Sequence, residues 1–332
     1  MSAPTILDVA ARAGVSKSSV SRVLLDSPSV SDATRQAVHQ AIADLDFRPN
    51  LAARTLVSRR SGAIGVLVTD FHNPFFQDVL DGIDEITGLG KYTPIVVSGK
   101  RMQKSEEGAL HRLLELQVDG IICVTATPQQ HALQAAARIT PMVILTRTPE
   151  LPYVDSVVND DFYGARLVVQ HLLELGHQHI AMIADDQELA GTDRIKGYQQ
   201  TMKENGFEQN IQITPGGFTE TGGYTGVKRL LQTNANLTAI FAANDLSALG
   251  VLNAAVELGL DVPNDLSVVG YDNIFASTLK HINLTTIDQR AKIIGETATK
   301  VLLERIENPR RAAQRIVTTP VLITRSTTRR PR

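Results

Sequence analysis

The sequence predicts a small all-α head of the helix-turn-helix type, followed by a two-lobed α/β core with parallel sheets. Near the N-terminus, apolar residues recur at three- and four-residue steps, which is the period of amphipathic helices. From residue 63 onward, unbroken runs of Val, Ile and Leu alternate with helical segments. This alternation is typical of parallel sheets that are covered on both faces.

Residues 5–25 read as two short helices joined by a tight turn. The apolar positions of the first helix form one stripe: Leu7, Val9, Ala10 and Ala13. Gly14 can adopt the positive φ that closes such a turn. Ser16 stands where an N-cap belongs, so we expect its hydroxyl to accept an amide hydrogen bond from the second helix, residues 17–25.

The second helix turns Val20, Val23 and Leu24 inward and presents a polar face. Its outward positions carry hydroxyls, a Lys and an Arg: Lys17, Ser18, Ser19, Ser21 and Arg22. Such side chains can reach phosphates and base edges in a DNA major groove. An ordinary helical hairpin with a solvated face is the alternative. A third helix, for which residues 32–35 supply a cap and the first turn and which runs through Leu45, favours the DNA-binding interpretation.

The charge is unevenly distributed along the chain. Residues 1–62 carry eight basic and five acidic side chains, so this part has a net charge of +3. The whole chain has a net charge of −2, which leaves −5 for the remainder. A small basic head on an acidic body is expected where the head meets phosphates and the body meets something else.

The composition is that of a globular protein of two or three domains, with 43% hydrophobic and 20% charged residues. No apolar run approaches the roughly 20 residues that a membrane helix needs, and the N-terminus lacks a secretory signal pattern. The single cysteine, Cys123, lies in an apolar run and excludes an intramolecular disulfide. We therefore expect a cytoplasmic protein without a membrane segment.

The core elements follow one another as two similar α/β units, which suggests two lobes with a cleft at the carboxyl ends of the strands. The expected strands are 64–68, 94–97, 120–124, 142–145, 180–184, 239–242 and 266–271. The expected helices are 76–89, 106–116, 129–138, 162–175, 194–204, 222–231 and 246–258.

The sequence shows no device typical of an enzyme. Neither a G-x-G-x-x-G fingerprint after a strand nor a G-x-S-x-G elbow occurs. His177 and His179 stand two residues apart at a strand start without a third ligand nearby, a pattern that is more often structural. We expect no catalytic residues, no metal ligands and no cofactor.

The order D-V-A-x-x-A-G-V-S-x-x-x-V-S-R-V-L, followed by V-S, T-R and R-P-N, resembles the LacI–GalR family of bacterial repressors. The resemblance covers essentially the whole chain. It implies a periplasmic-binding-protein-like core, in which a helix at 293–306 returns to the first lobe and 316–323 forms a closing strand. The implied domains are a DNA-binding head (1–49), a hinge (50–62), a first lobe (63–161 with about 291–320) and a second lobe (162–290 with about 321–332).

The resemblance implies that the partner is operator double-stranded DNA, bound by a homodimer. The hinge would fold on DNA, where Leu56 would wedge between base pairs from the minor groove. A flexible basic linker is the alternative for this segment. The residues expected to contact DNA are Thr5, Ser16, Lys17, Ser18, Ser19, Ser21, Arg22, Ser31, Asn50, Ala53, Arg54 and Leu56.

Three family motifs point to a small-molecule effector between the lobes. Arg194 matches R-x-x-G-[YFW], Asn244 matches A-N-D with Asp245 capping the next helix, and Asp272 matches V-G-[YF]-D. A carboxylate, a guanidinium, an amide and aromatic rings together suit a polyhydroxylated ligand. The expected effector-binding residues are Asp70, Phe75, Phe76, Arg147, Arg194, Phe218, Asn244, Asp272 and Gln289. For Phe75 and Phe76, the alternative is that they cap the core.

One departure from the family concerns Thr146, where many relatives carry aspartate before the arginine that is Arg147 here. It suggests an effector that is less hydroxyl-rich at that end or bears an acidic group. The chain ends without the apolar heptads that tetramerise some relatives, so we expect a dimer. The alternatives for function are a sugar-binding protein without a DNA-binding role and a sugar-processing α/β enzyme.

Overall fold

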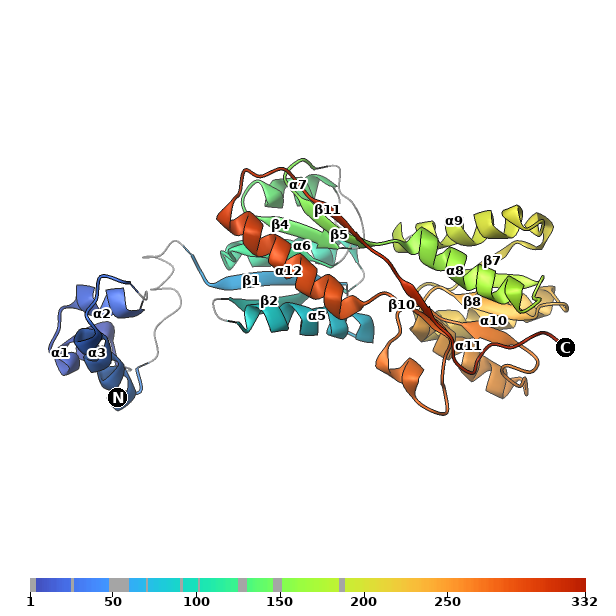
Figure 1. Cartoon of the computed structure of the whole chain (residues 1–332), viewed down its shortest axis with the longest axis horizontal. Coiled ribbons are helices and arrows are strands. Elements are labelled where there is room, and N and C mark those ends of the chain that lie inside the picture. The colour runs from blue at the N-terminus through green and yellow to red at the C-terminus, as the bar shows by residue number, and fades with distance from the viewer. Residues whose placement is uncertain are drawn as a thin grey trace. The chain divides into compact units, whose positions relative to one another are not determined.

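The computed structural model divides the chain into two compact units, Met1–Ala63 and Ile64–Arg332 (Figure 1). The structure describes residues 4–24, 27–47, 60–69, 71–89, 92–100, 102–124, 130–145, 151–184 and 189–332. Several of the predicted site residues lie outside the described residues: Asn50, Ala53, Arg54, Leu56, Asp70 and Arg147. Thr146 and the predicted hinge helix also lie outside them.

The N-terminal unit is a helix-turn-helix followed by a third helix, as the sequence predicted. Its described helices are α1 (Ile6–Ala13), α2 (Lys17–Leu24) and α3 (Asp32–Asp44). They pack around the fully buried side chains of Val9, Val20 and Val38. Gly14 ends α1 with a φ of +66°, the left-handed conformation that the turn requires.

One position of the predicted apolar stripe in α1 is wrong. Leu7 is 62% exposed, whereas Ile6 packs against the head core. The buried stripe therefore runs Ile6, Val9, Ala10 and Ala13, which is the i, i+3, i+4, i+7 spacing of one helix face. Leu7 lies about 100° around the helix from Ile6 and faces away from that stripe.

The first lobe is built on a six-stranded sheet in the order β11-β5-β4-β3-β1-β2. Its strands are β1 (Ala63–Val68), β2 (Thr93–Ser98), β3 (Gly120–Cys123), β4 (Met142–Leu145), β5 (Asp155–Asn159) and β11 (Arg315–Thr318). The pairings from β11 through β5, β4 and β3 to β1 are parallel. The carboxyl ends of these strands therefore meet at one edge of the sheet.

Helices cover both faces of this sheet (Figure 1). They are α5 (Pro74–Thr87), α6 (Gln103–Glu115), α7 (Gln130–Ala137) and α12 (Ala291–Glu307). On one face, α5 and α12 share a buried apolar cluster with alternate strand residues such as Ile64, Val66 and Val68. On the other face, a side chain at Gly65 would meet Leu113 of α6, so the helix lies close against the strand there.

The second lobe repeats this plan on a four-stranded parallel sheet in the order β7-β6-β8-β9. Its strands are β6 (Ile180–Ala184), β7 (Gln212–Pro215), β8 (Ala239–Ala242) and β9 (Ser267–Val269). Helices α8 (Asp161–Glu174) and α9 (Leu189–Glu204) cover one face, and α10 (Glu220–Thr233) and α11 (Asp245–Glu257) cover the other. Short 3₁₀ helices span Glu208–Asn210 and Phe275–Thr278.

The predicted closing strand 316–323 is wrong in one respect, because it is two strands in different sheets. β11 pairs with β5 in the first lobe, whereas β12 (Val321–Ile323) pairs antiparallel with β10 (Thr286–Asp288). Pro320 lies between them and supplies no N–H to continue a ladder. After β12 the C-terminal chain runs along the second lobe (red in Figure 1), where Thr327 Oγ1 donates to the Val268 carbonyl.

Candidate DNA-binding face and effector site

The predicted DNA-binding face of α2 is open to solvent. Lys17, Ser18 and Arg22 are exposed, and Ser19 and Ser21 are partly exposed. The opposite side of the helix is held by Val20 and Val23, which are buried in the head core. A rigid helix thus presents hydroxyl, ammonium and guanidinium donors on one side, which is the set that phosphates and guanine edges require.

Three of the predicted DNA-contacting residues cap helices in the head. Thr5 begins α1 in a capping box, Ser16 Oγ accepts from the Ser19 amide at 3.1 Å, and Ser31 accepts from the Thr34 amide. The N-cap role predicted for Ser16 is confirmed. All three capping residues are exposed, so their contact with DNA stays a prediction compatible with these bonds.

The topology of the second lobe brings several predicted effector residues to one edge of its sheet. Asn244 follows β8, Asp272 follows β9, and Phe218 lies between β7 and α10. Arg194 projects from α9, and Gln289 follows β10. All five of these side chains are buried.

Arg194 is held by a carboxylate, a carbonyl and an aromatic ring. Its Nε donates to Asp161 Oδ1 at 2.9 Å, its Nη1 donates to the Ala243 carbonyl at 2.5 Å, and its guanidinium lies 3.7 Å from the centroid of the Tyr271 ring. Burial alone would lower the pKa of Arg194, but the neighbouring Asp161, Tyr271 and Asp272 raise it above its ordinary value. The charged guanidinium keeps one nitrogen, Nη2, that donates to no described residue.

Asp272 is the acidic counterpart in this cluster. Its Oδ1 accepts a hydrogen bond from Gln289 Nε2, while its Oδ2 accepts none from the described residues. Burial raises the pKa of Asp272 to about 8, although Arg194 opposes the shift. At neutral pH this carboxyl group is therefore largely protonated and can both donate and accept.

Gln289 links Asp272 to the first lobe. Its Nε2 donates to Asp272, and its Oε1 accepts from Asn159 Nδ2 at 3.3 Å. Asn159 Nδ2 also donates to the Tyr271 hydroxyl at 3.3 Å. The amide of Gln289 is thus committed to protein partners on both sides.

Asn244, and not Asp245, caps helix α11. Asn244 is the N-cap of α11, where its Oδ1 accepts from the Ser247 amide at 2.9 Å. Asp245, the first helical residue, accepts instead from Thr286 Oγ1 at 2.5 Å and from the Ile274 amide at 2.9 Å. The prediction that Asp245 caps the helix is therefore wrong, because Asn244 already occupies that position.

The predicted aromatic residues are also buried. Phe75 and Phe76 stand edge to face in the apolar cluster of the first lobe, which also contains Ile274 from the second lobe. Their place in this cluster favours the interpretation that they close the core. Phe218 lies beside Arg194, whose guanidinium is 5.5 Å from the ring centroid.

Three members of the cluster were not among the predicted site residues: Asn159, Asp161 and Tyr271. Tyr271 stands in the V-G-Y-D motif and could have been assigned from it. Asp161 lies 33 residues from its partner Arg194, and no local pattern marks that pairing. Asn159 ends a strand that the sequence did not predict.

Two further searches of the described residues gave negative results. Within the described ranges, no three or more His, Cys, Asp or Glu side chains are grouped so as to hold a metal ion. Among the helices in the described part of the chain, none combines the length and apolar character needed to cross a membrane.

A helix-turn-helix head on a two-lobed parallel α/β core, with a buried polar cluster at the edge of one sheet, defines a DNA-binding regulator that responds to a small molecule. Residues 5–50 match the model of the bacterial regulatory proteins of the lacI family. Residues 169–328 match the model of a periplasmic binding protein-like domain.

Curated and solved relatives agree with this class. Catabolite control protein A of Priestia megaterium is 34% identical over 302 residues, covering 90% of this chain and 91% of the relative. The lac repressor dimer bound to operator and the anti-inducer ONPF has a TM-score of 0.87 at 29% identity, over 99% of this chain and 100% of that chain. The complex of the transcriptional regulator CelR with cellobiose has a TM-score of 0.73 at 30% identity, over 98% and 99%.

The chain belongs to the LacI family of bacterial regulatory proteins. The predictions of the family, of the fold class and of a DNA-binding transcriptional regulator are confirmed.

Proposed function

We propose that the protein is a bacterial cytoplasmic repressor that binds a near-palindromic operator as a homodimer, under the control of a sugar or sugar-derived effector. The exposed donors of α2 support the DNA-binding part. Lys17 and Ser18 start the helix and would read bases, and Arg22 would contact a base or a phosphate. Binding, not catalysis, is the proposed role of the core.

The homodimer is supported by the likeness to the lac repressor dimer and by the surface of the second lobe. Phe275 is 75% exposed and Val256 is 80% exposed there. We propose that both side chains lie in the dimer interface, where association would remove their apolar surface from water. A two-fold dimer would place two heads on half-sites about one helical turn apart.

The proposal for the effector site rests on two polar atoms, one of Arg194 and one of Asp272, that have no hydrogen-bond partner among the described residues. Arg194 Nη2 can donate and Asp272 Oδ2 can accept or donate, beside the ring of Phe218. Hydroxyl groups satisfy both atoms at once, as a sugar would. The relative CelR was solved with cellobiose, which is a ligand of this chemistry.

The charge of the cluster argues for a neutral ligand at this end. Arg194 already pairs with Asp161, and Asp272 and Asp245 add further buried acid. A carboxylate or phosphate placed here would find Arg194 already paired with Asp161, so its charge would be poorly compensated, at a cost that burial increases. An acidic group on the effector would have to lie elsewhere, and the predicted Arg147 stays a candidate for it.

A thermal-shift panel with the full chain tests the effector site. The panel contains cellobiose, neutral monosaccharides, sugar acids, sugar phosphates, purines and amino acids. A ligand at 100 times its dissociation constant adds about 2.7 kcal/mol, or roughly 5–10 °C for a protein of this size. The shift should disappear in Arg194→Met and Asp272→Asn and persist in the control Lys203→Ala, whose side chain is exposed. An equal shift in all four proteins would exclude this cluster as the site.

Selection of DNA from a randomised library tests the other half. The enriched sequence should be an inverted repeat, and its affinity should fall steeply as salt rises. Lys17→Ala and Arg22→Ala should weaken binding to it, while Lys203→Ala should not. Enrichment of a sequence without two-fold symmetry would contradict the dimeric mode.

A further inference from the structure

Asn159 touches all three of the described segments that connect the two lobes. It ends β5, directly before the chain enters α8 of the second lobe. Its Nδ2 donates to Oε1 of Gln289, which lies on the segment from β10 to α12. Its Oδ1 accepts from Oγ1 of Thr318 at 3.2 Å, at the end of β11 and before the passage to β12.

These contacts form a chain of hydrogen bonds with one direction. Thr318 donates to Asn159, Asn159 donates to Gln289, and Gln289 donates to Asp272. Bonds aligned in this way polarise one another, and the chain ends on Asp272, one of the two groups proposed to meet the effector. The second hydrogen of Asn159 Nδ2 goes to the hydroxyl of Tyr271, the ring that carries Arg194.

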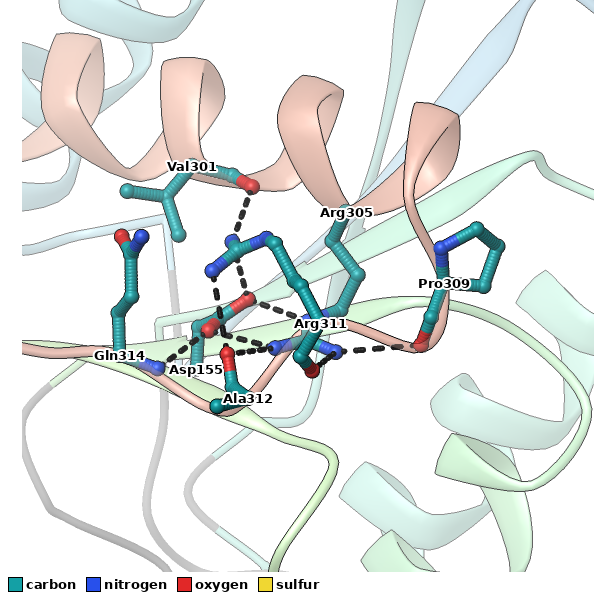
Figure 2. A network of polar contacts seen from close by, with 7 residues as sticks. All are labelled: Asp155, Val301, Arg305, Pro309, Arg311, Ala312 and Gln314. Carbon is teal, nitrogen blue, oxygen red and sulfur yellow. Dashed lines mark hydrogen bonds and ion pairs between the residues drawn. The ribbon is translucent and has the colours of Figure 1, made fainter.

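The opposite ends of the same elements are fixed by a buried ionic cluster, which Figure 2 shows. Asp155 starts β5, Arg305 lies near the end of α12, and Arg311 precedes β11. Asp155 accepts from both guanidinium groups and from the Gln314 amide. Because β5 and β11 are anchored at these ends, a movement of the segments that connect the lobes would displace mainly the carboxyl ends of the two strands, where Asn159 lies.

We infer that Asn159 is a positioning residue that couples the state of Asp272 to the three lobe connections, and through them to operator affinity. The inference rests on the proposed effector site. Asparagine suits the role because it supplies two donors and one acceptor in one plane, and the structure uses all three. A leucine of similar volume would keep the packing and break every link.

The test uses the full chain and the DNA fragment selected from the randomised library, with a scrambled fragment for non-specific binding. Asp272→Asn replaces the carboxyl group at the end of the chain with an amide and so serves as the input in place of the unidentified effector. Operator affinity is measured with and without this substitution in the wild type, in Asn159→Leu and in Thr318→Val. Thr318→Val is isosteric and removes the hydroxyl that donates to Asn159 and to the Val158 carbonyl, which keeps the test valid if Asn159→Leu folds poorly. Asn205→Leu is the matched control, because the Asn205 side chain, directly after α9, donates among the described residues only to the Thr201 carbonyl of that helix.

We expect Asp272→Asn to change operator affinity roughly fivefold or more in the wild type and in Asn205→Leu, the usual range for coupled sites. In Asn159→Leu and Thr318→Val the same change should fall below about twofold. An equal response in all backgrounds would overturn the coupling role of Asn159 and leave the effector site standing. If Asp272→Asn changes operator affinity in none of the backgrounds, the coupling role of Asn159 is overturned as well. The ligand panel then decides separately whether the effector site is correct.

Discussion

Replacing Asp155 with alanine should destabilise the core more than breaking any exposed ion pair would. Asp155 is fully buried and accepts four hydrogen bonds from the described residues, at 2.5 to 2.8 Å. Two of them come from Arg305, which is itself 1% exposed, and one comes from Arg311. The alanine variant leaves both guanidinium groups in the interior without a carboxylate (Figure 2).

The size of the expected loss in unfolding free energy follows from the charged groups that remain unpaired. Removing one partner of a buried ion pair typically costs 3–5 kcal/mol, since the other charge stays desolvated. Carbonyls of Pro309, Arg311 and Ala312 still accept from Arg305 and limit the loss. For a core of this length, about 3–5 kcal/mol lowers the unfolding midpoint by roughly 10 °C.

Urea unfolding at pH 7, followed by circular dichroism, measures the loss. Glu208→Ala is the control, because it breaks the exposed pair with Lys203 and should cost about 1 kcal/mol or less. The double variant Asp155→Leu/Arg305→Met should be more stable than Asp155→Ala, since it removes the more deeply buried of the two stranded charges and leaves only Arg311, which is partly exposed. A folded Asp155→Ala protein that loses less than about 1 kcal/mol would refute the idea that this cluster anchors β5, α12 and β11.

Three further outcomes are expected. The pKa of Asp272 is raised from 3.8 to about 8, so the stability that its protonated form contributes is complete below about pH 4 and is lost as the pH rises through 8. Asp272→Asn should lack this loss of stability. Urea unfolding at pH 5, 7 and 9 would show the difference between the two proteins as at least about 1.4 kcal/mol. Gly164→Ala should lower the free energy of unfolding by about 1–3 kcal/mol, since its methyl group would overlap the Tyr271 hydroxyl. Gly108→Ala places its methyl group in open space near a flexible arginine and should be neutral or stabilising. Differential scanning calorimetry compares the two variants. Thr5→Ala should remove the capping box of α1 and cost the head about 1 kcal/mol, visible as faster amide exchange in that helix and unchanged exchange in α12.

Local signals predicted the head well. The period of apolar residues, the glycine at position 14 and the hydroxyl at position 16 act within a few residues of one another, so they can be read directly from the sequence. The error at Leu7 came from choosing the wrong member of two adjacent apolar residues. Only the packing of α1 on α3 shows that the stripe starts at Ile6.

The buried apolar strands were also predicted, whereas β5, β7 and β10 were not. Each of these three carries polar residues, as in Asp-Ser-Val-Val-Asn for β5 and Thr-Ile-Asp for β10. The polar ends of β5 are buried by partners that lie far away in the chain. Asp155 meets an arginine 150 residues later, and Asn159 meets a glutamine 130 residues later.

In the effector cluster, too, the sequence does not determine which polar atoms find a partner in the fold. The sequence analysis named Gln289 as an effector residue because it lies at a lobe crossing, and the structure brings it beside Asp272, where each end of its amide already has one protein partner. Arg194 and Asp272, by contrast, each keep one polar atom that no described residue satisfies. The difference depends on which partners surround each side chain, and a motif does not contain that information. The hydrogen-bond geometry therefore separates atoms that already have a protein partner from atoms that have none among the described residues, and Gln289 keeps one N–H and one lone pair for a ligand.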